Sequence, residues 1–120
     1  MDRYELRSAD AVETVEFDWG RLHWYASGAL GNSEHLTVGQ CVIRPGCANP
    51  SHGHPDCEEV LHLLRGRIEH AVAGKDTVPM EAGDTITIAP GVRHSARNVG
   101  SEDAHMLICF STRERKTVGE

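Results

Sequence analysis

The sequence predicts an all-β fold, a sandwich or barrel built from short strands. Its apolar residues recur with a period near two, and no stretch carries the longer period of an amphipathic helix. Twelve glycines and five prolines fit a chain that turns often. At 120 residues there is room for one core. We expect a single domain over residues 1–120, with 1–18 as a padding segment and 112–120 as a polar tail.

Eight short strands are expected, each bounded by residues that favour turns. They lie at residues 21–26, 36–44, 58–64 and 67–73, in a short segment ending near residue 80, and at residues 85–89, 94–99 and 104–111. Gly66 separates two of these strands and predicts a hairpin, and Gly74 predicts the next turn. The first 18 residues could hold a turn of helix or a strand, and the last nine are expected to fray or to contact a partner.

Composition and charge exclude several classes of function. The net charge of −6, without a basic cluster, argues against nucleic-acid binding. The basic residues near the end of the chain, Arg113, Arg115 and Lys116, are interrupted by an acidic one and predict a solvated terminus. No apolar run approaches the roughly 18 residues of a membrane span, and the first residues lack the apolar run of a signal peptide. We therefore expect a cytoplasmic protein without nucleic-acid or membrane partners.

Three histidines are candidate metal ligands. His52 and His54 are two residues apart, so an extended strand would place both imidazoles on one face, with about 7 Å between their Cα atoms. Taken alone, such a pair is equally typical of a protein surface. Antiparallel closure can bring the strand that begins at His94 beside the strand of His52. Together these residues predict imidazoles that converge on one ion.

A carboxylate near these histidines could complete the ligand set. Glu58 and Glu59 point to opposite faces of a strand, so only one of them can be a ligand. We choose Glu59, because Leu61 then shares the interior face, while His62 faces outward and would be a ligand only in the other register. Cys57 lies two residues before Glu59 and could approach the ion. The four cysteines have no paired spacing, so free thiols are expected.

Two glycine-bounded segments resemble the two motifs of the cupin family. The first reads Gly46, five residues, His52-x-His54, four residues, Glu59, six residues and Gly66. The second reads Gly83, five residues to position 89, Gly91, two residues, His94, three residues and Asn98. One departure is visible: the proline usual in the family falls at Ala89, with Pro90 beside it.

The resemblance implies a double-stranded β-helix, the jelly-roll barrel of cupins, with one divalent transition metal ion near its centre. The implied ligands are His52, His54, Glu59 and His94. Iron, manganese, nickel, copper and zinc all tolerate three imidazoles and a carboxylate. If the ion is six-coordinate, two positions remain for a substrate or dioxygen. Small cupins also imply a homodimer through an exchanged or added edge strand, since open strand edges favour pairing.

The function class expected from these features is an enzyme that acts on a small oxygenated substrate. It would be a dioxygenase, or an isomerase or decarboxylase that uses the ion as a Lewis acid. The alternative is a module that binds a metal or small ligand without turnover, and a metal-free cupin of the sugar-epimerase type is a third hypothesis. Trp24 and Gln40 are the expected substrate-binding residues. Four further histidines lack a matched partner and are expected at the surface or half-buried: His23, His35, His70 and His105.

Overall fold

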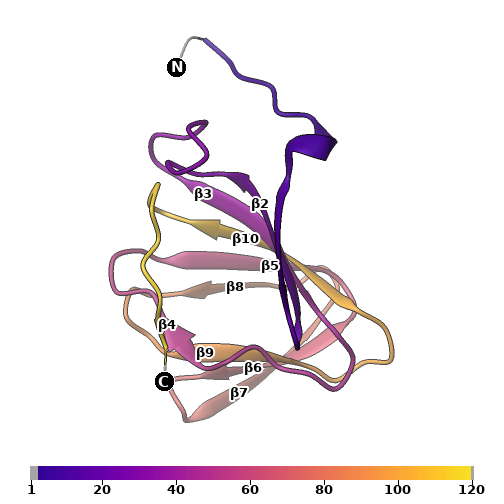
Figure 1. Cartoon of the computed structure of the whole chain (residues 1–120). Coiled ribbons are helices and arrows are strands. Elements are labelled where there is room, and N and C mark those ends of the chain that lie inside the picture. The colour runs from indigo at the N-terminus through magenta and orange to yellow at the C-terminus, as the bar shows by residue number, and fades with distance from the viewer. Residues whose placement is uncertain (1–2, 120) are drawn as a thin grey trace.

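The computed structural model describes residues 3–119, which contain eleven β-strands and one 3-10 helix, η1 (Ala9–Ala11). The strands form two antiparallel sheets (Figure 1). One sheet has the order β1 (Glu13–Phe17), β2 (Gly20–Ala26), β3 (Thr37–Ile43), β10 (Ala104–Phe110), β5 (Glu59–Arg65), β8 (Thr85–Ile88). The other has the order β11 (Val118–Gly119), β4 (His52–Gly53), β9 (His94–Asn98), β6 (Arg67–Val72), β7 (Asp76–Glu81). The predicted all-β fold is confirmed.

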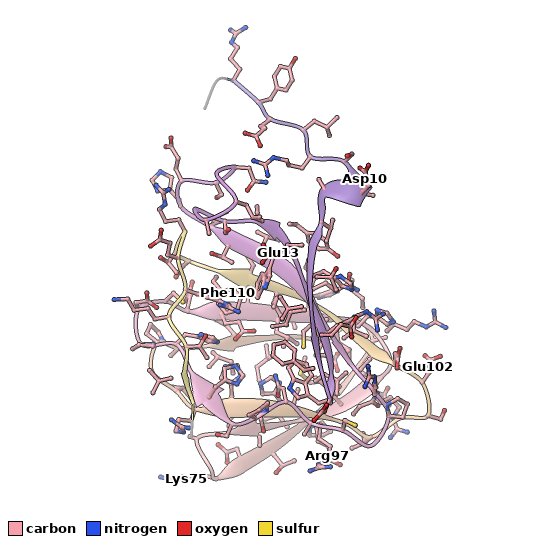
Figure 2. The ribbon with its side chains drawn as sticks, in the orientation of Figure 1. Asp10, Glu13, Lys75, Arg97, Glu102 and Phe110 are labelled. Carbon is pink, nitrogen blue, oxygen red and sulfur yellow. The ribbon has the colours of Figure 1, made fainter. Side chains whose placement is uncertain are left out.

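The core lies between the two sheets because both contribute alternate apolar side chains to it. Leu61 and Met106 come from the first sheet, and Ile68 and Ala96 from the second. Figure 2 shows Lys75, Arg97 and Glu102 at the periphery of the molecule, whereas Phe110 lies in its interior and is buried. Among residues 3–119, no helix has the length and apolar character needed to cross a membrane.

All eight predicted strands are present, with ends that differ from the prediction by at most one residue. The first 18 residues contain both of the elements considered for them, the short helix η1 and the strand β1. Two strands of two residues each, β4 and β11, were not predicted. Both are too short to show an alternating pattern, so periodicity could not reveal them.

The hairpin predicted at Gly66 is wrong. β5 pairs with β10 and β8, whereas β6 pairs with β9 and β7, so the chain passes from one sheet to the other at this residue. Gly66 has a φ of +94°, and a Cβ atom there would lie 3.0 Å from the Cα of Ala104. The glycine marks a sharp corner, but a turn signal does not say which sheet receives the next strand. The second predicted turn, at Gly74, does join the paired strands β6 and β7.

Residues 112–119 of the polar tail are not frayed. Their strand β11 pairs with β4, and Figure 1 shows the yellow end of the chain running past β4. The backbone carbonyl of Arg113 accepts a hydrogen bond of 2.8 Å from the N–H of Gly28, and the N–H of Lys116 donates to Asp56 at 3.3 Å. These bonds hold the tail against the barrel beside the histidine-bearing segment.

Candidate metal centre

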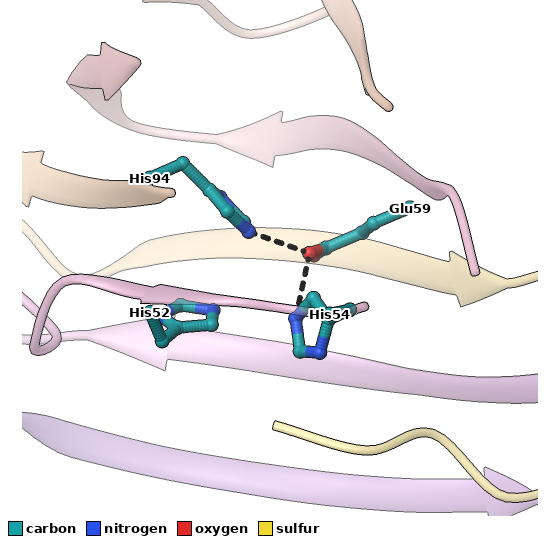
Figure 3. A group of neighbouring side chains, drawn as sticks. All are labelled: His52, His54, Glu59 and His94. Atoms are coloured by element: carbon teal, nitrogen blue, oxygen red, sulfur yellow. Dashed lines mark ion pairs between the residues drawn. The ribbon is translucent and has the colours of Figure 1, made fainter. Parts of the chain in front are cut away.

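The four predicted metal ligands lie together between strands of the two sheets (Figure 3). His52 is in β4, His54 follows directly after it, Glu59 begins β5 and His94 begins β9. The expected closure of the His94 strand beside the His52 strand is confirmed, because these two residues are register partners. One ligand atom from each of the four side chains lies within 4.8 Å of the others. Donors sharing one ion at about 2.0–2.2 Å can be up to about 4.4 Å apart, so small side-chain adjustments would suffice.

Glu59 faces inward, as the alternation of its strand predicts. Glu59 and Leu61 are buried, whereas His62 points outward and its Nδ1 lies 2.7 Å from the hydroxyl of Thr85. Cys57 is buried in the apolar core and is not part of the donor group. The register that turns Glu59 inward is therefore the one in the folded chain.

The carboxylate of Glu59 lies between two imidazoles. Its Oε1 is 3.3 Å from Nε2 of His54 and 3.2 Å from Nε2 of His94. Burial opposes ionisation, but the two imidazoles, when they carry a proton on Nε2, attract and hydrogen-bond the carboxylate more strongly and lower the pKa of Glu59 to about 2. Within residues 3–119, none of these three buried atoms has a well-directed hydrogen bond. Buried polar atoms normally have hydrogen-bond partners. Two imidazole nitrogens and a carboxylate oxygen that lie together without them fit a site for a cation.

Backbone carbonyls orient two of the imidazoles. Nδ1–H of His52 donates to the carbonyl of Pro50 at 2.7 Å, and Nδ1–H of His54 donates to the carbonyl of Lys116 at 2.9 Å. A neutral imidazole that carries its proton on Nδ1 presents a lone pair at Nε2. Both rings are therefore held in the tautomer that binds a metal through Nε2.

The third imidazole is held by another histidine. Nδ1 of His94 lies 2.9 Å from Nε2 of His70, and the two ring planes differ by 10°. His70 is only 1% exposed, so the expectation of a surface or half-buried position is wrong. Burial lowers the pKa of His70 to about 4, which keeps its ring neutral. His70 follows Ile68 by two residues on a strand whose side chains alternate in direction. This spacing could have predicted that His70 points inward with Ile68.

A cavity of about 460 Å³ adjoins the four donors. Its walls are mainly apolar and aromatic: Phe17, Trp19, Leu22, Trp24, Leu61, Met106, Ile108 and Phe110. Trp24 thus lies where a substrate-binding residue was expected. Gln40 does not line this cavity. Its side chain accepts a hydrogen bond from the hydroxyl of Tyr25 at 2.6 Å and lies 3.2 Å from Nδ1 of His105. Gln40 alternates with the inward Cys41 on β3, which corrects its predicted role in the pocket.

Arg115 is the one Arg or Lys among the described residues that line the cavity. Its guanidinium carbon lies 4.1 Å from the centroid of the Trp24 ring and 5.4 Å from that of Phe110. The sequence placed this residue in a solvated terminus, and that prediction is wrong. No local pattern could have located it, because its position depends on the pairing of β11 with β4.

A family model described as "Cupin domain" matches residues 39–110. The chain belongs to the cupin family. One curated relative, "Polyketide synthase CurC" from Streptomyces cyaneus, is 36% identical over 113 residues, which cover 92% of this cupin and 73% of the relative. "Oxalate oxidase 1" from Hordeum vulgare is 26% identical over 96 residues, or 74% of this cupin and 46% of that protein.

Solved structures share the fold of this cupin. An oxalate decarboxylase from Lactobacillus farciminis, in a formate complex, superposes with a TM-score of 0.83 at 22% identity. The match covers 92% of this cupin and 34% of that chain. A Bacillus subtilis oxalate decarboxylase, studied for its Mn(II) centres, gives a TM-score of 0.81 at 22% identity over 89% of this cupin and 29% of that chain. This cupin thus spans about a third of these structures, and the jelly-roll prediction is confirmed.

Proposed function

We propose that this cupin is a metal-dependent enzyme that acts on a small oxygenated substrate. The proposed ligands are His52, His54, Glu59 and His94. The observation that carries the proposal is their position: four donors, three of them buried and two with preset tautomers, meet at the wall of a cavity that can admit a second molecule. A site closed on all sides would instead fit a structural or storage role. The alternative of a binding module without turnover becomes the better description only if no substrate is converted.

One divalent transition metal ion is proposed for this set, which iron, manganese, nickel, copper and zinc all accept. Such an ion would supply Lewis acidity, which binds and polarises substrate oxygens. The protein's own groups hold the donors: Glu59 offsets part of the ionic charge, and the carbonyls of Pro50 and Lys116 fix two rings. The Mn(II) centres named for the Bacillus subtilis decarboxylase make manganese one candidate to test.

The reaction class is either dioxygenation or a redox-neutral isomerisation or decarboxylation. One relative is named an oxidase, whose reaction consumes oxygen, and one structural neighbour a decarboxylase, so resemblance alone favours neither class. Oxygen uptake separates them. Iron-loaded protein that consumes oxygen and incorporates its atoms into the product is an oxygenase, whereas conversion of the substrate without oxygen uptake identifies the redox-neutral class.

Metal content tests the proposed centre directly. Protein purified without added metal is expected to hold about one divalent ion per chain by elemental analysis. His94→Ala removes a buried donor from the cluster and should reduce that content sharply. His105→Ala is the matched control, since His105 lies outside the cavity beside Gln40. Unchanged stoichiometry in His94→Ala would contradict the assignment.

We also propose a homodimer formed along β1. This strand lies at the edge of the six-stranded sheet, and all five of its residues are exposed, including the apolar Val15 and Phe17. An open edge with exposed apolar side chains favours pairing with a second strand. Light scattering on the eluting protein should give twice the mass of the chain, and replacing Val15 with Lys should shift it toward the monomer.

A further inference from the structure

The cavity beside the metal centre is large and mainly apolar. Its volume of about 460 Å³ falls within the range of sites that hold drug-sized ligands. At about 30 Å³ for each water molecule, it corresponds to about 15 waters. Oxalate, after which several relatives are named, is far smaller and polar on every edge. It would leave most of this cavity unfilled.

The walls favour a flat ligand. Four aromatic side chains line the cavity: Phe17, Trp19, Trp24 and Phe110. Phe17 and Trp19 stack with ring centroids 4.8 Å apart and planes that differ by 8°. Rings pack well against other rings and against aliphatic side chains, while a polar group placed there without a partner would lose its hydration. The body of the ligand should therefore be an aromatic or similarly planar apolar group.

One positive group faces this apolar space. The guanidinium of Arg115 is half-buried over Trp24 and Phe110, and no acidic side chain among residues 3–119 forms an ion pair with it. Its contacts with the two rings restrain the guanidinium, whose N–H groups can donate to a carboxylate, sulfonate or phenolate. An anionic ligand would supply the partner that the protein does not.

Residues 115–119 hold both the cationic group of the cavity and part of the metal centre in place. The carbonyl of Lys116, the residue after Arg115, accepts the hydrogen bond that orients His54. β11, which follows, pairs with β4, where His52 lies. The cationic group and two of the metal donors are therefore held at a set spacing by backbone contacts.

From these observations we infer that the cavity binds an aromatic, oxygen-bearing acid. Its ring lies among the aromatic walls, two of its oxygens meet the ion held by the histidines and Glu59, and its acidic group pairs with Arg115. The inference names the substrate class of the proposed enzyme and rests on the proposed metal centre for the oxygen-binding end. Arg115 is then the residue that selects acids over neutral aromatic molecules.

Calorimetric titration of zinc-loaded protein tests this, because zinc has no redox chemistry and the probe stays intact. The probes are a dihydroxynaphthalene sulfonate with adjacent hydroxyl groups, the same diol without the sulfonate, and oxalate. The sulfonate should bind about 10- to 100-fold more tightly than the neutral diol, as a hydrogen-bonded charge pair predicts, and oxalate most weakly. Both tryptophans of the chain line the cavity, so binding should also quench tryptophan fluorescence.

Variants separate the role of Arg115 from a structural one. Arg115→Gln should abolish the preference for the sulfonate and leave the affinity for the neutral diol unchanged, while Arg115→Lys should keep part of the preference. Arg65→Gln, an exposed arginine paired with Glu102, is the matched control and should change neither affinity. Equal weakening of both probes by Arg115→Gln, or tighter binding of oxalate than of the sulfonate, would overturn the inference.

Zinc stoichiometry distinguishes failure of this inference from failure of the proposed function. One equivalent of zinc without sulfonate binding leaves the metal centre standing and refutes the substrate class. If zinc does not bind, the metal centre fails, and titration of the metal-free protein still tests Arg115: the sulfonate preference must persist and must vanish in Arg115→Gln.

Discussion

Replacing His70 with Leu should weaken metal binding without weakening the fold. His70 is not one of the four proposed ligands, but its Nε2 lies 2.9 Å from Nδ1 of His94. Leucine has a similar volume, so the buried position stays filled. What the substitution removes is the hydrogen-bond partner of His94.

The magnitude follows from the tautomers of His94. When Nε2 binds an ion, the ring proton must sit on Nδ1, where it needs an acceptor. In the variant this N–H is buried without one, which costs about 1–3 kcal/mol, or about 5- to 150-fold in metal affinity. In the metal-free protein the proton can move to Nε2 and face Glu59, so the cost disappears. The substitution also removes Nδ1 of His70, which has no partner in residues 3–119.

Two measurements together test the reasoning. Competition with a zinc-chelating dye should show about 5- to 150-fold weaker binding in His70→Leu. Chemical denaturation of the metal-free variant should show a free energy of unfolding equal to that of the wild type or higher. His105→Leu replaces a partly exposed histidine outside the cavity and should leave the zinc affinity and the metal centre as they are in the wild type. Wild-type zinc affinity in His70→Leu would refute the positioning role, and a large loss of metal-free stability would refute the tautomer argument.

Two further predictions concern acid and the corner between the sheets. Burial lowers the pKa of His52 from 6.5, so the neutral ring that a metal requires persists below that value; half of the metal should be released only below pH 6.5. Dialysis at a series of pH values followed by elemental analysis checks this, and release that begins above pH 7 would contradict it. Gly66→Ala should lower the free energy of unfolding by about 1–3 kcal/mol, since the residue has a φ of +94° and its Cβ would crowd Ala104. Gly74→Ala shares the left-handed conformation but meets nothing within 4 Å, so denaturation should show a smaller loss there.

Sequence periodicity predicted most strands of the barrel and the direction in which Glu59 points. The alternation through residues 59–65 is strong enough that Glu59 could be assigned to the interior beside Leu61, and the structure agrees. The spacing of His52 and His54 and the position of His94 could be matched because they lie in segments whose glycines fix the turns. Local patterns report local geometry, and these features are local.

Pairing between distant segments could not be predicted in the same way. Gly66 looks like a hairpin turn, yet it joins strands of different sheets, because the partners of β5 and β6 come from elsewhere in the chain. Arg115 looks solvated in a charged tail, and only the contact of β11 with β4 brings it over Trp24. Gln40 carries a plausible polar group, but the alternation of β3 turns it toward Tyr25.

The division between these two kinds of residue has a functional meaning. The four proposed metal donors all lie within residues 39–110, the part of the chain that matches the family model. Four residues that shape the proposed substrate end lie outside it: Phe17, Trp19 and Trp24 before it and Arg115 after it. One barrel can thus keep its metal centre while flanking segments change the ligand that reaches it. Substrate class in this cupin should therefore respond to substitutions in the flanks, such as Arg115→Gln, while metal content follows the four donors.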